Sequence, residues 1–186
     1  MPLKIEVPKE MIDKLHEAYK KEIWVDHEAG VLKYKEIPIF WSRSELLYNM
    51  FKEMVGLMGQ SAGAIMERAT RPHGGGFVAF LREEKKEASQ SREGIMRLAC
   101  ADALATGWGQ VRMEESHQDI RVICEKGFPV GQMYVEKGER SPGPVDYYFL
   151  GYFTGVLSAM DNKVYKGVEE ECIAKGDERC VFVFKK

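Results

Sequence analysis

The chain has 186 residues and a formal net charge of −2, from 27 basic and 29 acidic side chains. This length fits one domain with a sizeable core, and a hydrophobic content of 45% is ordinary for a globular protein. The balanced charge gives no basic surface for nucleic acid and no reason to expect an anionic membrane as partner. No apolar run reaches the roughly 18 residues of a membrane helix, and the first residues lack an apolar signal core, so we expect a cytoplasmic protein. Its four cysteines are then expected to be thiols or metal ligands rather than a disulfide framework.

The N-terminal part of the chain predicts a helix followed by a hairpin. A stripe of apolar residues recurs at helical spacing over residues 8–22, and β-rich segments flank a turn at residues 27–30. An apolar connector over residues 37–41 then leads to a long helix, for which Ser42 and Glu45 form a capping-box pattern. The apolar stripe of this helix is wide and rich in methionine, which is typical either of an ordinary core or of the wall of a ligand pocket.

The middle of the chain predicts further helices and then a sheet. Residues 59–70 are rich in small side chains, and the sequence Arg-Pro-His-Gly-Gly-Gly at 71–76 predicts a break or a bend in that helix. His73 is expected in a surface turn, with a position facing a pocket as the alternative. Another helix is expected up to about Thr106, capped by Ser89 or Ser91. Three strands are predicted to follow, over residues 110–115, 118–125 and 131–136. Apolar residues alternate with polar ones in the first two, so one sheet face should be buried.

The C-terminal stretch predicts a helix and a hairpin. Apolar residues recur at three- and four-residue spacing over 145–160, and Gly151 and Gly155 would let another element approach that helix closely. The segment after the helix predicts two strands joined by a turn at residues 175–177.

Cys172 and Cys180 lie at equal distances from Gly176, so a hairpin closed there brings the two thiols together across the strands. Three interpretations are open: two buried thiols, a disulfide, or a metal site completed by neighbouring acids. On a regular strand Glu170 shares the face of Cys172, whereas Glu169 requires a bulge before that cysteine. Both glutamates are therefore candidates for the metal site.

Three motifs of the C-terminal stretch carry a family resemblance. They are Gly-Tyr-x-x-Gly at 151–155, Glu-x-x-Cys at 169–172 and Ala-x-Gly-Asp-x-x-Cys-x-Phe at 174–182. Together they resemble the C-terminal signature of the 4-vinyl-reductase-like domain, also called the predicted hydrocarbon-binding domain. This family is similar to the sensor domain of phenol-responsive transcription activators and, more distantly, to trafficking-complex subunits of the TRAPP type. The motifs cover the C-terminal part of the chain, and the preceding part matches in element order and hydrophobic pattern.

The resemblance implies a structural zinc site. In the phenol sensors a Pro-Val-Cys sequence opens the last helix, and its Cys binds zinc together with a Glu and two later Cys residues. Here the sequence Pro-Val-Asp stands at that place, ending in Asp146, while Glu169, Cys172 and Cys180 match the other ligands. Two thiolates with two carboxylates suit zinc, and a site saturated by protein ligands leaves no open position for catalysis.

An α+β fold is also implied: an antiparallel sheet of four to five strands covered by helices, as in the TRAPP-type subunits. Residues 1–186 would form one domain of this kind. Within it, residues 1–40 would be the dimerisation segment of a homodimer, and residues 41–186 the ligand-binding core.

A small hydrophobic or aromatic molecule is the ligand that the resemblance implies, held in an apolar pocket between helices and sheet. The residues expected to line this pocket are Trp41, Met50, Met54, Phe77, Trp108, His117, Tyr147, Phe149 and Phe153. As a sensor, the domain would act on a separate signalling output protein.

Two other functions stay open. The sequence favours binding over catalysis, because it lacks Ser-His-Asp, nucleophile-elbow, dinucleotide and His-Glu-x-x-His patterns. An enzyme acting on a tetrapyrrole or another hydrophobic substrate is nevertheless consistent with the family name. A protein-assembly scaffold is consistent with the TRAPP-type subunits.

Overall fold

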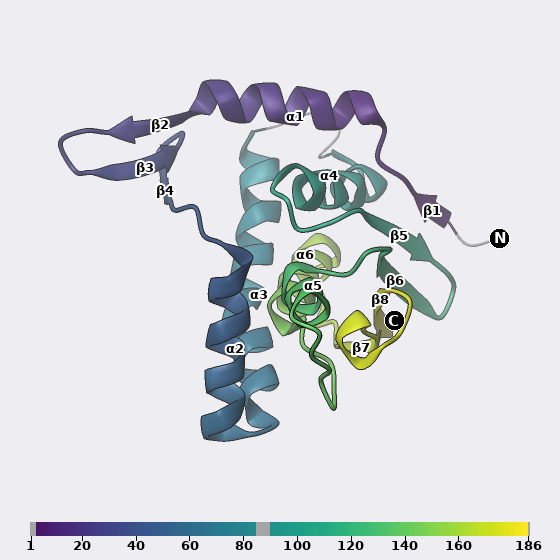
Figure 1. Ribbon diagram of the computed structural model, residues 1–186. Coiled ribbons are helices and arrows are strands. Elements are labelled where there is room, and N and C mark those ends of the chain that lie inside the picture. Colours follow the sequence, from purple (N-terminus) through teal and green to yellow (C-terminus); the bar gives the residue numbers. More distant parts are fainter. Residues whose placement is uncertain (1–2, 85–89, 186) are drawn as a thin grey trace.

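The structure is a computed structural model that describes residues 3–84 and 90–185. In chain order its elements are β1 (Leu3–Ile5), α1 (Lys9–Glu22), β2 (Ile23–Asp26), β3 (Val31–Tyr34), β4 (Ile37–Ile39), α2 (Ser44–Met58), α3 (Ser61–Glu83), α4 (Arg92–Ala105), β5 (Val111–Glu115), β6 (Asp119–Cys124), α5 (Pro129–Glu136), α6 (Tyr147–Asp161), β7 (Gly167–Glu171), a 3-10 turn (Ile173–Lys175) and β8 (Cys180–Lys185) (Figure 1). Among the helices of the described residues, none is long and apolar enough to cross a membrane.

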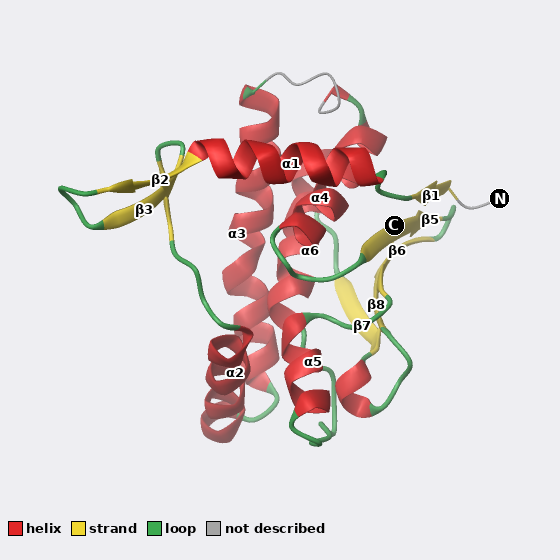
Figure 2. Cartoon of the chain, turned by 45° about the horizontal axis from the view of Figure 1, so that its top comes forward, coloured by secondary structure: helices red, strands yellow, loops and turns green. Residues whose placement is uncertain are grey.

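The main sheet has five antiparallel strands in the order β1-β5-β6-β8-β7. Helix α4 packs against β5 and helix α6 against β7, so helices cover one face of the sheet (Figures 1 and 2). Ile120 and Val122 of β6 belong to the main core, while Ile123 joins a small apolar cluster on the opposite face. The predicted α+β fold is therefore confirmed, as is the alternation expected of β6.

Helices α3 and α6 pack closely against each other in the centre of the molecule (Figure 2). Glycines make this contact possible. A Cβ atom added to Gly74 would lie 1.9 Å from the Tyr152 carbonyl oxygen, and one added to Gly155 would lie 2.0 Å from the Arg71 carbonyl oxygen. A Cβ atom on Gly151 would likewise meet α3 at 2.0 Å, so the close approach predicted at Gly151 and Gly155 is confirmed.

Of the break or bend predicted at residues 71–76, the break is wrong, because α3 continues through them to Glu83 with Pro72 inside the helix. Pro72 removes one helical hydrogen bond and disfavours the helix locally. Burial of Gly74 against α6 outweighs that preference, since tertiary contacts routinely override helix propensity. His73 therefore lies on a helix and not in a surface turn.

Residues 131–136, predicted as a strand, form most of helix α5 instead. Pro129 suits the first helical turn. Val130 and Tyr134, which are four residues apart, are both buried, so the apolar period of this segment is helical.

Smaller differences concern the first part of the chain. Strands β1 and β4 were not predicted, because three residues each are too few to show an alternating pattern. The predicted capping box is wrong: α2 begins at Ser44 without a side-chain cap, and the Ser42 hydroxyl bonds the Arg43 carbonyl. Of the two predicted caps of α4, Ser89 lies outside the described residues, and the Ser91 hydroxyl accepts a hydrogen bond from the Gly94 amide at 3.0 Å.

We call α1 and the sheet β2-β3-β4, residues 9–39, the arm: α1 lies across α4, and the small sheet protrudes from the body (Figures 1 and 2). The predicted hairpin is present as β2 and β3. Two contacts at the base of the arm join it to α3: the Lys35 ammonium lies 2.8 Å from Glu84, and the Tyr34 ring lies 6.2 Å from the Phe80 ring. Helix α1 contains no buried residue, so the arm adds little to the core.

Candidate metal centre and aromatic site

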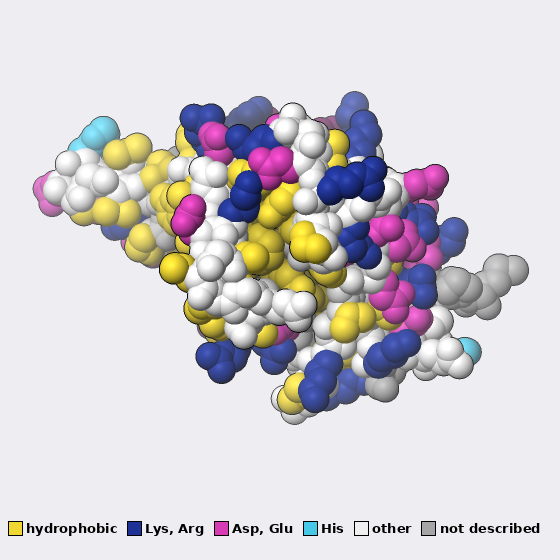
Figure 3. All heavy atoms as spheres, turned by 60° about the horizontal axis from the view of Figure 1, so that its bottom comes forward, with side chains coloured by type: hydrophobic (Ala, Val, Ile, Leu, Met, Phe, Trp, Pro, Cys, Tyr) yellow, Lys and Arg dark blue, Asp and Glu magenta, His cyan; other side chains and the backbone are white. Residues whose placement is uncertain are grey.

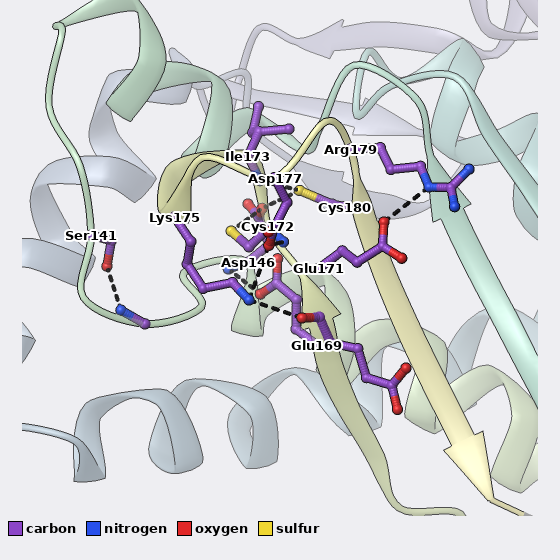
Figure 4. A network of polar contacts seen from close by, with 12 residues as sticks. Ser141, Asp146, Glu169, Glu171, Cys172, Ile173, Lys175, Asp177, Arg179 and Cys180 are labelled. Atoms are coloured by element: carbon purple, nitrogen blue, oxygen red, sulfur yellow. Dashed lines mark hydrogen bonds and ion pairs between the residues drawn. The ribbon is translucent and has the colours of Figure 1, made fainter.

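Four buried side chains with metal-binding atoms meet at the turn of the terminal hairpin (Figure 4). Asp146 precedes the first turn of α6, Glu169 lies in β7, and Cys172 and Cys180 flank the turn between β7 and β8. One ligand atom from each residue lies within 4.8 Å of those of the other three. The structure thus brings together the four residues that the family resemblance implied.

A β-bulge decides between the two candidate glutamates. The pairing of β7 with β8 shifts between Glu169 and Glu171, which leaves Glu170 as the extra residue. Glu169 consequently turns into the protein and is 6% exposed, whereas the Glu170 side chain is 43% exposed. The bulge that Glu169 requires is present, and Glu170 lies outside the cluster.

Hydrogen bonds hold the two carboxylates but leave one oxygen without a partner. Asp146 Oδ1 accepts a hydrogen bond from the Gly131 amide, near the start of α5, at 3.0 Å. The Asp146 amide in turn donates to Glu169 Oε2 at 3.0 Å. Glu169 Oε1 is buried and has no hydrogen-bond partner among the described residues. Such a group is uncommon in a folded protein, and a cation bound at the cluster would satisfy it.

The four candidate metal ligands bring acidic groups together in a buried environment. Burial, reinforced by the charge of Cys172, raises the pKa of Asp146 to about 7. Burial and the charge of Asp146 raise the pKa of Glu169 well above its ordinary value. A hydrogen bond from Cys180 lowers the pKa of the Cys172 thiol to about 6, and the same bond raises the pKa of Cys180. Within the described ranges no Lys or Arg forms an ion pair with Asp146 or Glu169, so a bound cation is the natural source of compensating charge.

The turn that carries the thiols is fixed by its own contacts. The Cys172 amide donates to Asp177 Oδ2 at 2.7 Å, and Gly176 has a φ of +106°, which a residue with a side chain rarely adopts. From the loop before α6, the Ser141 amide donates to the Ala174 carbonyl at 2.9 Å. The two cysteines are therefore positioned by the fold before any ion binds.

A second group of residues, which we call the aromatic cluster, lies where α3, α6 and the end of α4 meet. It consists of His73, Phe77, Trp108, Tyr148, Phe149 and Tyr152. The Trp108 and Tyr152 rings are 4.8 Å apart between centroids and nearly perpendicular, and the His73 and Tyr152 rings are 5.3 Å apart. Tyr152 is fully buried, Trp108 and Tyr148 are partly buried, and His73 is exposed, so the cluster reaches the surface on one side.

Polar groups border the aromatic cluster. Asp102 of α4 accepts hydrogen bonds from two tyrosine hydroxyls, that of Tyr152 at 3.3 Å and that of Tyr19 from the arm. Burial raises the pKa of Asp102. His73 Nδ1 lies 3.4 Å from the Tyr148 hydroxyl, and desolvation lowers the pKa of this imidazole, which favours its neutral form.

The residues predicted to line a pocket are only partly brought together. Phe77, Trp108 and Phe149 belong to the aromatic cluster, and the Phe153 ring packs against that of Tyr152 at 5.2 Å. The remaining five predicted residues lie elsewhere. Trp41 is 77% exposed and Met50 is 46% exposed, and Met54 is partly buried on α2. Tyr147 packs against Phe51 and Gly63, and His117 is exposed in the turn between β5 and β6.

Sequence reasoning gave His73 a pocket position only as the alternative to a surface turn, and it missed Asp102, Tyr148 and Tyr152 as members of a site. A signal was present, because Tyr148 and Tyr152 are four residues apart and so share one face of α6. The predicted break at residues 71–76 hid the corresponding spacing of His73 and Phe77 on α3. Nothing in the sequence places Asp102 beside Tyr19, since that contact depends on how the arm lies on α4.

Comparison with known proteins finds structures of the same fold but does not assign the chain to a family. No model of a protein family matches the chain. An uncharacterised protein of Methanocaldococcus jannaschii, MJ0855, is 35% identical over 71 residues, which are 35% of this chain and 31% of that protein. The aligned part is thus less than a third of the length of that relative.

Two solved structures share the fold. The phenol-responsive sensory domain of the transcription activator PoxR, solved with phenol, matches with a TM-score of 0.74 and 16% identity, over 94% of this chain and 89% of that one. Subunit 3 of a trafficking protein particle complex from Naegleria fowleri, covalently bound to palmitic acid, matches with a TM-score of 0.50 and 14% identity, over 77% and 95% of the two chains. At these identities the likeness concerns the fold alone.

Proposed function

We propose that this chain is a sensor domain that binds a small hydrophobic or aromatic molecule at the aromatic cluster. The observation that carries the proposal is the cluster itself. Aromatic rings from α3, α6 and the end of α4 converge there beside a neutral imidazole and reach the surface on one side. Ligand sites typically combine apolar and aromatic walls with a few placed polar groups.

The rings of the cluster are in contact, so a ligand takes its place by displacing one of them. Tyr148 is the ring that turns outward in this proposal, because it is only partly buried, while Trp108 stays in contact with the ligand. Phe77, Phe149 and Phe153 would then form the apolar wall, and His73 would offer a hydrogen bond to a polar group of the ligand. The shared fold with a phenol-responsive sensory domain supports this proposal by analogy.

The cluster of Asp146, Glu169, Cys172 and Cys180 is proposed to hold a structural zinc ion. Two sulfur and two oxygen donors suit zinc, and the orphaned Glu169 Oε1 gains a partner when a cation binds. All four positions of a tetrahedron are then taken by the protein. In this proposal the ion ties the start of α6, which carries Tyr148 and Tyr152, to the terminal hairpin.

The arm, within residues 1–40, is proposed to form a homodimer. Trp24, Val25 and Ile37 of the arm are at least 42% exposed, and Phe40 and Trp41 beyond it are each 77% exposed. Figure 3 shows hydrophobic side chains gathered on the protruding hairpin. Apolar surface of this extent is typical of an interaction site. The sensor would pass its signal to a separate output protein, and its free thiols fit the reducing cytoplasm.

Titration calorimetry with phenol and benzyl alcohol tests the proposed function. We expect micromolar binding to the native protein, on the order of 8 kcal/mol. His73→Ala and Trp108→Ala should each weaken it about tenfold or more, since each removes a group that touches the ligand. Trp24→Ala, which removes a partly exposed tryptophan of the arm, is the control and should leave binding unchanged. Equal binding by all four proteins, or none by the native chain, would contradict the proposal.

An assembly scaffold is the second candidate, favoured by the exposed apolar arm and by the shared fold with a trafficking-complex subunit. A scaffold would be recovered with one stoichiometric partner protein. A sensor would be recovered with a small molecule.

A further inference from the structure

Asp102 is a carboxylate placed among aromatic rings without a cationic partner. Its two oxygens accept hydrogen bonds from the Tyr19 and Tyr152 hydroxyls, which are neutral donors. In the part of the chain that the structure describes, no Lys or Arg forms an ion pair with it. A partly buried carboxylate held by neutral groups alone is poorly compensated when it is ionised.

The aromatic rings beside Asp102 provide ring faces that can attract a cation bound to this carboxylate. Tyr152, which donates to Asp102, also packs edge to face on Trp108 at 4.8 Å. Phe77 and His73 lie against the same tyrosine, at 5.9 Å and 5.3 Å between ring centroids. The faces of Trp and Tyr rings attract cations, most strongly where the cation is partly desolvated.

We propose that the ligand of this site is an organic ammonium: a primary or methylated amine on a small aromatic or aliphatic body, with its cationic head on Asp102 and its body among the rings of Trp108 and Tyr152. This rests on the proposed function and names its ligand class. Asp102 is then the residue that determines specificity.

Other cations fit the site less well. One carboxylate with two phenol hydroxyls is too small a donor set for calcium or magnesium, which need six or more oxygen ligands. The aromatic rings supply no ligand atoms for a transition metal, but they do supply contact area for carbon. An ammonium group carries N–H or N–CH₃ groups that can reach the carboxylate and the ring faces together.

The experiment compares two ligands of nearly equal shape, benzylamine in its protonated form and benzyl alcohol, by titration calorimetry on the full chain at pH 7. The native protein should bind the ammonium at least about tenfold more tightly than the alcohol, because only the ammonium forms an ion pair with Asp102. Asp102→Asn, which keeps the shape of the side chain, should lower this ratio to about one and leave alcohol binding in place. Asp13→Asn removes an exposed acid of α1 with the same change in net charge, and should keep the native ratio.

Each outcome decides the proposal. Tighter or equal binding of the alcohol by the native protein overturns it, as does an unchanged ratio in Asp102→Asn. Absence of binding by both molecules contradicts the proposed function, whereas alcohol binding alone contradicts only the ligand class. If Asp102→Asn does not fold, Tyr19→Phe replaces it. This variant removes a neutral donor from the carboxylate and should raise the ratio, and a lower or equal ratio overturns the proposal.

Discussion

The C-terminal region buries most of its apolar side chains, whereas the arm leaves several of its own exposed. Most of α6 and β8 is buried, down to Phe149, Phe153 and Phe182 at zero exposure. The arm has no buried residue in α1 and leaves Trp24 42% exposed. In our proposals the C-terminal region is stabilised by its own packing and by a zinc ion, and the arm by a second copy of the chain. Changes in the two regions should therefore be detected by different measurements.

Removing a metal ligand should have the largest effect. Cys180→Ser exchanges a thiolate for a hydroxyl, and structural zinc contributes on the order of 10 kcal/mol of binding free energy that is linked to folding. We expect loss of zinc by elemental analysis and a large fall in melting temperature, with faster hydrogen exchange in β7, β8 and the start of α6. Acid should release the ion from the native protein, because thiolate ligands must be deprotonated.

The control for that substitution is Cys100→Ala, a buried thiol of α4 outside the cluster. It should keep one equivalent of zinc. Zinc retained by Cys180→Ser, or less than about a tenth of an equivalent in the native protein after reconstitution under reducing conditions, would leave Cys172 and Cys180 as core thiols.

Introducing a methyl group where α3 and α6 touch should have the next largest effect on stability. Gly74→Ala places a Cβ atom 1.9 Å from the Tyr152 carbonyl oxygen, so the helices must separate. We expect a loss of about 2–4 kcal/mol in the free energy of unfolding, measured by chemical denaturation.

Gly75 and Gly76 offer matched controls on the same helix, because a Cβ atom there meets nothing within 4 Å. Gly75→Ala and Gly76→Ala should be neutral or stabilising by up to about 1 kcal/mol, since alanine favours a helix more than glycine does. A similar loss at all three positions would mean that the glycines do not mark the helix contact.

The bulge in β7 predicts that substitutions of two neighbouring glutamates differ in their effect on zinc affinity. Glu169→Gln should weaken zinc binding by about 10- to 100-fold, because it replaces a carboxylate ligand by an amide. Glu170→Gln, one residue away and on the exposed side, should bind zinc as the native chain does. Competition with a chromophoric chelator measures both. The reverse order would mean that the strand is regular and that Glu170 is the ligand.

Substitutions of the exposed residues just after the arm should change assembly and leave the fold almost unchanged. The double variant Phe40→Asp and Trp41→Asp should convert a dimer of twice the 21.2 kDa chain mass into a monomer, seen by light scattering. Its free energy of unfolding as a monomer should change by about 0.5 kcal/mol or less, because both side chains are exposed. Val164→Asp, at a position that is 79% exposed after α6, should leave the dimer intact.

The sequence predicted those features that local patterns determine. The stripe of α6, the arm hairpin, the terminal hairpin and the two strands β5 and β6 are visible as periodicities of 3.6 and 2. The candidate metal cluster was predictable because Cys172 and Cys180 are symmetric about a turn, and the family resemblance supplied Asp146 and Glu169.

What the sequence could not give depends on contacts between distant segments. Helix α3 passes through Pro72 and Gly74 because α6 lies against it, and a local reading of those residues predicts a break. The aromatic cluster depends on the same contact, since it joins His73 of α3 to Tyr148 and Tyr152 of α6. Asp102 entered no prediction, because only the folded chain brings it between hydroxyls of α1 and α6.

Native mass spectrometry of the freshly purified protein tests the central claim, that the aromatic cluster binds a small molecule, most directly. We predict a species heavier than chain plus zinc by the mass of one small organic molecule per chain, or uptake of benzylamine or benzyl alcohol when these are added. The double variant His73→Ala and Trp108→Ala should lack this mass while it keeps its zinc. A native chain that carries no small molecule and takes up neither compound would contradict the account.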